Sequence, residues 1–176
     1  MKSISYFLIM FFCSHIILSQ SDYPEPKKTP VRLFYIQHSN NHNTYVYDIN
    51  LKNGIIDLQQ PINEYQIAYA KDGAKKPLTN IQKKLAYGIT LEESNSEYLK
   101  FRLAASKTLY FYLNKNSKTS DFRIFVTINN HKIYLNKMFV QLKTDYLGIN
   151  AKAEYVLFWG EDFDSGKLVQ EKVILE

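Results

Sequence analysis

Cysteine is nearly absent from this chain, which has one among 176 residues. A single thiol excludes a disulfide framework within the chain. Six glycines and five prolines are too few for a collagen-like or low-complexity protein. Disorder is excluded too, because 45% of the residues are hydrophobic and 15% are aromatic, whereas disordered chains are poor in aromatic residues. The length then allows one domain with its own core.

Arginine is also scarce, and only Arg32, Arg102 and Arg123 stand among the 22 basic residues. Proteins that bind nucleic acid usually rely on arginine and on basic residues gathered in one stripe. The lysines here are spread along the chain, and pairs such as Lys75-Lys76 are typical of solvated surface. We therefore expect no nucleic-acid partner, although the formal net charge is +5.

Long apolar runs are limited to one, from Tyr6 to Leu18, which follows a basic start. A membrane-spanning helix needs about 20 apolar residues, so this run is too short. A basic start, an apolar run and a polar exit are typical of a secretory signal peptide. We expect residues 1–21 to be removed and the protein to be exported to the periplasm or outside the cell. The mature chain would have no transmembrane span, and the loss of Cys13 would exclude thiol catalysis.

Two further segments follow the predicted signal peptide. Residues 22–30 contain three prolines and predict an extended leader, and residues 31–176 predict a single β-rich domain. Apolar residues alternate with a period of two in most of that domain, which predicts strands. The predicted strands are Val31–Gln37, Thr44–Leu51, Ile55–Ile56, Ile62–Tyr69, Glu97–Ala104, Thr108–Leu113, Phe122–Ile128, Lys132–Leu142, Glu154–Trp159 and Lys167–Leu175. We expect a mainly β fold, a single antiparallel β-sandwich or barrel.

Local signals add two hairpins and one helix to this plan. Asn53-Gly54 lies between two β-rich runs, and Asn129-Asn130 suits a tight turn, so both predict hairpins. Thr79 and Gln82 have the spacing of a capping box, which predicts a short helix. Ile81 and Leu85 would share its apolar face, with Gly88 as its C-terminal stop.

Four segments of the sequence together resemble a known family. They are the stretch Leu33–Thr44 leading into Tyr47, Tyr65–Ala70 with the following Lys71-Asp72-Gly73, Ile81–Gly88, and Trp159-Gly160-Glu161-Asp162 with Ser165-Gly166-Lys167. As a set they are similar to domain-of-unknown-function family 4833, a group of exported bacterial proteins, over Val31 to Glu176. Related chains tend to place arginine where this one has His38, and tryptophan near Gln66. The resemblance implies one exported domain and supplies no activity.

The densest polar cluster runs from His38 to Asn43. His38 and His42 would share one metal if a third ligand joined them, and Asp48 and His131 are the candidates for it. This is the alternative hypothesis of a metal-dependent or histidine-based hydrolase. The competing interpretation is an asparagine-rich turn. The sequence has no Gly-x-Ser-x-Gly motif and no phosphate-binding glycine loop, so we expect no cofactor.

The sequence is unusually rich in tyrosine, with 14 residues. Tyr45 and Tyr47 share a strand face, as do Tyr110 and Tyr112, and Tyr134 and Tyr155 are further members of such a face. A tyrosine row either packs across the sheet or presents a flat apolar surface with polar tips to a ligand. We predict a non-catalytic binding or accessory module for a glycan or a small amphipathic molecule. Its expected ligand-binding residues are Tyr45, Tyr47, Tyr110, Tyr112, His38, Asn40 and Asn43.

A third hypothesis is a structural partner in a cell-envelope assembly. Such a partner would expose an apolar patch or an unpaired edge strand. The sequence leaves this hypothesis open.

Overall fold

The computed structural model describes residues 23–115, 121–143 and 151–175, so the predicted signal peptide lies outside the described residues. The strands are β1 (Arg32–His38), β2 (Asn41–Ile49), β3 (Leu51–Lys52), β4 (Ile55–Ile56), β5 (Ile62–Ile67), β6 (Lys75–Pro77), β7 (Ile89–Ser94), β8 (Tyr98–Leu103), β9 (Phe111–Lys115), β10 (Phe122–Ile128), β11 (His131–Leu142), β12 (Ala153–Asp162) and β13 (Leu168–Ile174). One short helix, α1 (Asn80–Gln82), precedes β7. The mainly β fold with one short helix is therefore confirmed.

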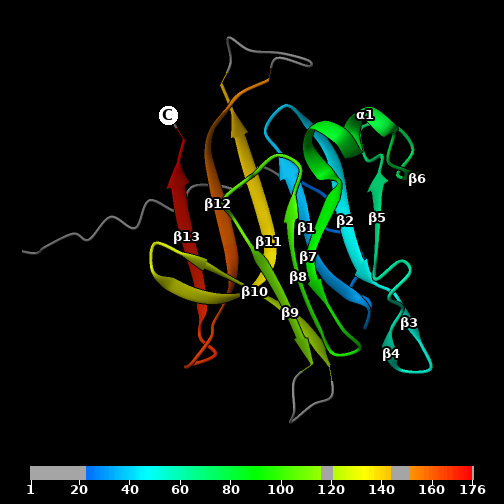
Figure 1. Ribbon diagram of the computed structural model, residues 1–176. Helices are drawn as coiled ribbons and strands as arrows, with labels where there is room; N and C mark the ends of the chain where they lie inside the picture. Colours follow the sequence, from blue (N-terminus) through cyan, green and yellow to red (C-terminus); the bar gives the residue numbers. More distant parts are fainter. Residues whose placement is uncertain (1–22, 116–120, 144–150, 176) are drawn as a thin grey trace, which may run out of the picture.

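The long strand β11 organises the sheet (Figure 1). On one edge it pairs with β12, which in turn pairs with β13. On its other edge, Ile133 and Tyr134 pair with β10, whereas the segment after the bulge at Leu135–Lys137 pairs with β1. Two wings therefore leave β11. One wing is β1–β2–β5–β6 and the other is β10–β9–β8–β7.

The sheet is mixed, because β1 pairs with β11 in parallel, with Tyr35 opposite Lys137 and His38 opposite Val140. The prediction of an antiparallel fold was wrong on this point. The antiparallel hairpins have short turns with recognisable residues, whereas this parallel pair joins segments about a hundred residues apart and leaves no local signal. The architecture is one large, curled, half-barrel sheet, with β3 and β4 forming a separate two-stranded sheet, so the predicted sandwich or barrel is confirmed only in part.

The core lies between the two wings and contains a column of four aromatic rings. Tyr47 of β2 stacks on Phe34 of β1 with ring centroids 4.4 Å apart. Phe34 meets Phe111 of the other wing at 5.3 Å, and Phe111 meets Phe101 at 5.2 Å. The Tyr47 hydroxyl donates to the backbone oxygen of Tyr87 at 2.8 Å, so this buried polar group is satisfied.

Both predicted hairpin turns are confirmed. Asn53 and Gly54, between β3 and β4, have φ values of 54° and 78°. Asn129 and Asn130, between β10 and β11, have φ values of 52° and 64°. Two successive positive φ values define the turn whose twist matches that of the flanking strands, and asparagine and glycine tolerate this conformation best.

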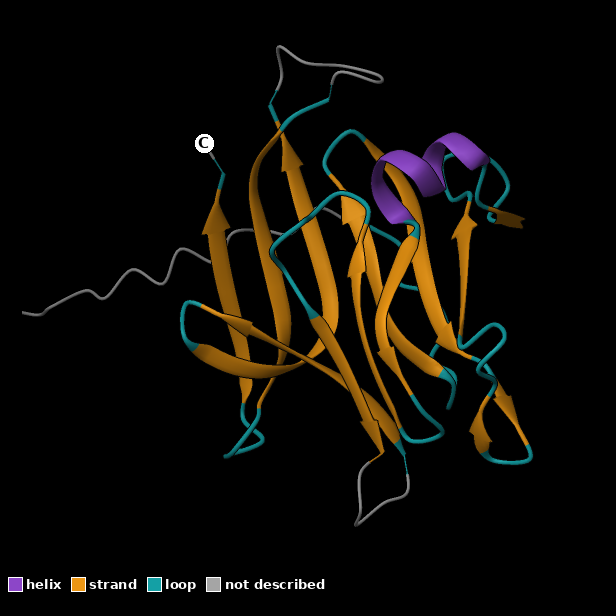
Figure 2. Ribbon diagram, in the orientation of Figure 1, coloured by secondary structure: helices purple, strands orange, loops and turns teal. Residues whose placement is uncertain are grey.

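The predicted helix is present, but its apolar face is not buried. Both bonds of the Thr79 capping box form, and α1 continues into a π-helical turn, Lys83–Tyr87. Ile81 and Leu85 remain 65% and 54% exposed, because the wider turn directs Tyr87 toward the sheet instead. Figure 2 shows this helical segment at one end of the sheet.

The leader packs along the sheet. Gln37 donates through Nε2 to the Pro24 carbonyl at 2.9 Å, and the Tyr23 ring lies 5.3 Å from that of Phe139. These contacts place the leader against β1 and β11. Among the described helices, none combines the length and the hydropathy that a membrane crossing requires.

Candidate functional site

The structure separates the four tyrosines that the sequence grouped. Tyr45 and Tyr47 are only 6% and 0% exposed. The Tyr45 ring lies face to face with that of Tyr87, with centroids 3.6 Å apart. Both tyrosines of β2 are therefore part of the core, and neither ring can reach a ligand.

Tyr110 and Tyr112 lie elsewhere, partly exposed on the outer face of β9 and of the loop before it. Tyr112 stacks on Phe125 of β10 with centroids 5.0 Å apart and planes 10° apart. Phe125 meets Phe163 at 5.5 Å, and Phe163 stacks on Tyr134 of β11 at 4.8 Å. We call these five residues, Tyr110, Tyr112, Phe125, Tyr134 and Phe163, the outer aromatic row.

The strand register builds this row. Tyr112 is opposite Phe125, and Phe125 is opposite Tyr134, so three rings from three neighbouring strands lie side by side. Phe163 follows β12, and its backbone nitrogen donates to the Lys132 carbonyl at 3.0 Å. Sequence reasoning missed Phe125 and Phe163. The alternation along β10 could have shown that Phe125 points away from the core. The position of Phe163 depends on the tertiary fold and could not have been predicted.

Two cations lie directly against the outer aromatic row. The Lys132 ammonium is 3.4 Å from the Phe163 ring centroid and 4.1 Å from that of Phe125. The Arg123 guanidinium is 4.1 Å from the Tyr134 centroid. Cations over ring faces are attracted by the negative quadrupole of the ring. This part of the surface therefore combines apolar rings with positive charge.

Two more cations lie at the Tyr110 end of the row. Lys100 and Arg102, both on β8, are 5.1 and 5.9 Å from the Tyr110 ring centroid. Each also has a carboxylate partner, since Lys100 pairs with Glu93 at 2.8 Å and Arg102 pairs with Glu92. These ion pairs are exposed, so each adds little to stability.

Lys132 differs from the other three cations because each of those pairs with a carboxylate. Arg123 pairs with Glu161 at 2.8 Å, which compensates its charge. Within the part of the chain that the structure describes, Lys132 has ring contacts and no carboxylate partner. Among the described residues, the row therefore carries one positive charge without a carboxylate partner, near its centre.

The polar loop of the sequence lies on the other wing, at the β1–β2 turn. His38 shares a hydrogen bond of 2.9 Å between its Nε2 and the Tyr87 hydroxyl, and burial lowers its pKa to about 4. The imidazole is therefore neutral at pH 7. The side chains of Asn40 and Asn41 bond to each other, and the Asn43 nitrogen donates to Asn41 Oδ1 at 2.8 Å. This is the asparagine-rich turn of the competing interpretation.

The structure does not gather the candidate metal ligands. His42 packs its ring against Tyr23, at 4.9 Å between centroids. Asp48 lies at the far end of β2, where it accepts from Arg32 and from the Tyr65 hydroxyl at 2.8 Å. Across residues 23–115, 121–143 and 151–175, no three histidine, cysteine, aspartate or glutamate side chains form a metal site.

His131 instead bridges two carboxylates. Its Nδ1 is 2.7 Å from Glu171 and its Nε2 is 2.8 Å from Asp162, and these bonds raise the histidine pKa. Bonds from Ser165 and then from His131 lower the Asp162 pKa, and bonds from His131 and then Asn129 lower that of Glu171. Ser165 bonds to the aspartate and not to the histidine, so this is not the arrangement of a serine nucleophile with its base. The cluster ties β11, β12 and β13 together.

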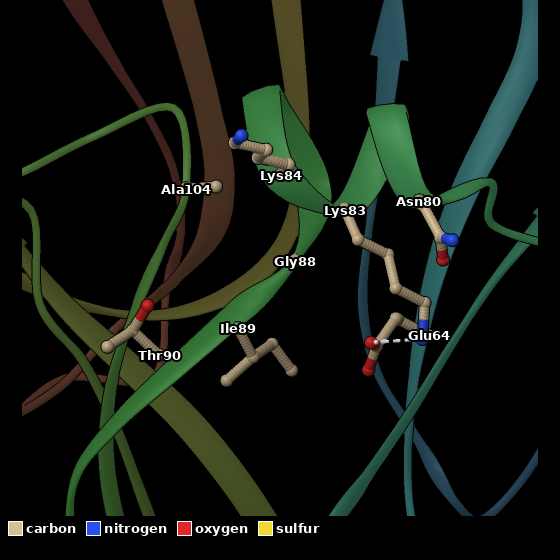
Figure 3. Close-up of a pocket in the computed structure, with 8 residues that line it drawn as sticks. All are labelled: Glu64, Asn80, Lys83, Lys84, Gly88, Ile89, Thr90 and Ala104. Atoms are coloured by element: carbon tan, nitrogen blue, oxygen red, sulfur yellow. Dashed lines mark ion pairs between the residues drawn. The ribbon is translucent and has the colours of Figure 1, made fainter.

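An open groove of about 380 Å³ lies between the helical segment and β7 (Figure 3). Its lining residues are Glu64, Asn80, Lys83, Lys84, Gly88, Ile89, Thr90 and Ala104. Lys83 and Glu64 pair across it at 3.0 Å, and Lys84 also lines it. Its lining residues include no aromatic ring, in contrast to the outer aromatic row.

The comparisons with known proteins identify a family and no activity. The family model described as "Domain of unknown function (DUF4833)" matches residues 34–172, which is most of the chain. No curated protein and no solved structure matches.

Proposed function

The chain belongs to the DUF4833 family, and on that premise we propose that it is a non-catalytic binding module. Its ligand face is the outer aromatic row. The observation that carries the proposal is the contiguity of the five rings, which neighbour one another at centroid distances of 4.8 to 6.5 Å. The ligand we propose is a glycan.

The shape of the row supports a chain-like ligand. The row runs from Tyr110 through Tyr112 and Phe125 to Phe163 and Tyr134, so it is several rings long rather than a single stacking site. Tyr112 and Phe125 stack face to face, and the three tyrosines of the row are partly exposed, so the surface combines apolar rings with hydroxyl groups. A short glycan combines apolar C–H groups, which can pack against rings, with hydroxyls, which can hydrogen-bond to tyrosine.

The charge of the row favours an acidic glycan. Lys132 is already held at the centre of the row by its ring contacts, and its charge has no carboxylate partner in the described chain. A carboxylate on the ligand would supply that partner and accept a charge-assisted hydrogen bond.

The titratable groups support a role without catalysis. Acid–base catalysis needs a group that is free to exchange a proton with the substrate. Asp48 is bonded to Arg32 and Tyr65, and His131 is bonded to two carboxylates, so both are engaged within the protein. Neither lies in the outer aromatic row.

We also propose that the module acts after export. The support is the apolar run Tyr6–Leu18 with its basic start and polar exit. N-terminal analysis of the chain secreted by a bacterial host tests this, and the expected first residue is Asp22. Recovery of only the intact chain, starting at Met1 in the cytoplasm, would contradict it.

Binding to a panel of neutral and acidic polysaccharides tests the ligand face. Tyr110→Ala and Tyr112→Ala are expected to weaken binding of the retained polysaccharide at least tenfold together, which is about 1.4 kcal/mol. The matched control is Tyr69→Ala on the other wing, whose hydroxyl donates to the Glu25 carbonyl. This variant lies outside the row and should bind normally. Equal binding by the double variant and the wild type would refute the proposed face.

A further inference from the structure

Strand β13 forms a free edge of the sheet. Within the described residues it pairs with β12 alone, in a continuous antiparallel register from Leu168 to Ile174 (Figure 1). The pairing has no bulge and the strand has no proline, so two of the usual devices that block further pairing are missing, and its only charged residues are Glu171 and Lys172.

The direction of its backbone groups follows from two hydrogen bonds. The Leu175 nitrogen donates to Glu154, and the Asp162 nitrogen donates to Lys167. In an antiparallel pair, alternate residues direct both backbone groups to the same neighbour, so the odd-numbered residues here face β12. The even-numbered residues direct their N–H and C=O groups to the free edge. They are Leu168, Gln170, Lys172 and Ile174.

The same strand holds the two most exposed large aliphatic side chains of the described chain. Leu168 is 84% exposed and Ile174 is 73% exposed. They lie on one face, and each is three residues from Glu171. The strand is therefore nearly symmetric about Glu171, with apolar ends and a polar middle.

We propose that this edge binds a second copy of the chain, by antiparallel pairing of β13 with β13 about a two-fold axis at Glu171. Leu168 of each copy then lies opposite Ile174 of the other, and Gln170 lies opposite Lys172. All four residues with free backbone groups pair, and the exposed aliphatic side chains cover each other. Such an interface uses the same patch on both copies.

The charges of the strand are compatible with this register. The two Glu171 residues would be opposite each other at the axis, but each carboxylate is turned back to its own chain, where it is bound by His131 at 2.7 Å and by Asn129 at 3.0 Å. Lys172 lies over the Tyr155 ring of its own chain, 3.9 Å from the centroid. Neither charge therefore points at its equivalent across the axis.

Molar mass in solution tests the interface. The wild-type chain is expected to be a dimer by sedimentation or light scattering, and Leu168→Lys/Ile174→Lys is expected to be a monomer. The control Ile81→Lys/Leu85→Lys removes comparable exposed aliphatics from the helical segment and should remain a dimer. A monomeric wild type, or a control that dissociates equally, would overturn the proposal.

A disulfide between copies tests the register without altering the apolar ends. In a Cys13→Ser background, Gln170→Cys and Lys172→Cys are prepared separately. Directly opposite residues have Cα atoms about 5.5 Å apart, which suits a disulfide. The mixture should cross-link on oxidation, whereas each variant alone should not. Cross-linking of Gln170→Cys alone would show a different register and overturn the proposed one, and no cross-linking in the mixture would refute the pairing.

Discussion

Tyr112 of β9 and Phe125 of β10 stack across two neighbouring strands, with ring centroids 5.0 Å and planes 10° apart. The residues beside them, Leu113 and Ile124, point the other way and are buried in the core. One pair of strands therefore supplies the core with one face and the outer aromatic row with the other. Residues of the row can be replaced while the core stays intact.

Tyr45→Ala and Tyr110→Ala should differ in their effect on stability. The first leaves a cavity in the core opposite Tyr87 and should lower the free energy of unfolding by about 3–5 kcal/mol. The second removes a partly exposed ring and should cost about 1 kcal/mol or less. Urea denaturation measures both. Similar losses would show that Tyr110 is structural.

His131 should stabilise the protein most in mildly acidic solution. Its pKa is raised in the folded state, so its contribution is full below its unfolded value of 6.5 and is lost as the pH rises through the raised pKa. The pKa values of Asp162 and Glu171 are lowered, so their contributions need a pH above their usual values of 3.8 and 4.5. The stability lost in His131→Gln should therefore be greatest between pH 4.5 and 6.5.

Denaturation at several pH values measures this effect. His42→Gln is the control, because its ring packs against Tyr23 rather than between carboxylates. A loss in His131→Gln that is equally large in alkaline solution would contradict the account.

His38 should have the opposite dependence on pH. The unfolded chain binds a proton on it below about 6.5, whereas the folded chain does so only near 4, because burial lowers the pKa. Stability is therefore lost as the pH falls through this range. His38→Gln keeps an acceptor for Tyr87 and removes the titration, so it should lose less stability on acidification, by roughly 1–3 kcal/mol. Parallel pH profiles for the variant and the wild type would contradict this.

Gly160→Ala should push β11 and β12 apart. A Cβ at this position would lie 1.8 Å from the Tyr134 carbonyl oxygen, which is backbone and cannot move aside cheaply. The expected loss of stability is at least about 1–3 kcal/mol. Gly54→Ala is the comparison, since its Cβ would meet nothing within 4 Å and only its positive φ is strained. A smaller loss at Gly160 than at Gly54 would show that the strands separate easily.

The local features of the fold could be predicted from the sequence. The Thr79 capping box and the turns at Asn53-Gly54 and Asn129-Asn130 depend on a few adjacent residues, and all three are confirmed. β10 was predicted with its observed bounds, Phe122–Ile128. Strand β6 was missed because its three residues have no apolar alternation. Strand β7 was missed because its alternation, Ile89 and Leu91, stops at the bulge before Glu93.

The features that depend on distant contacts could not be predicted. The alternation in β2 shows that Tyr45 and Tyr47 share a face, but it cannot show which face the other wing and Tyr87 cover. Tyr110 and Tyr112 share a face in the same way, but theirs is the outer face of the sheet. Phe163 joins the row only because the chain after β12 returns beside Lys132.

Mapping the bound glycan on the protein is the most direct test of the ligand face. Backbone amide chemical shifts of the labelled chain are recorded while the polysaccharide retained in the binding panel is added. We predict that the shifts change in β9, in β10 and around Phe163, and that they stay constant in β1 and β2. Changes confined to the turn of Asn40 and Asn43, or to the groove beside β7, would contradict the account.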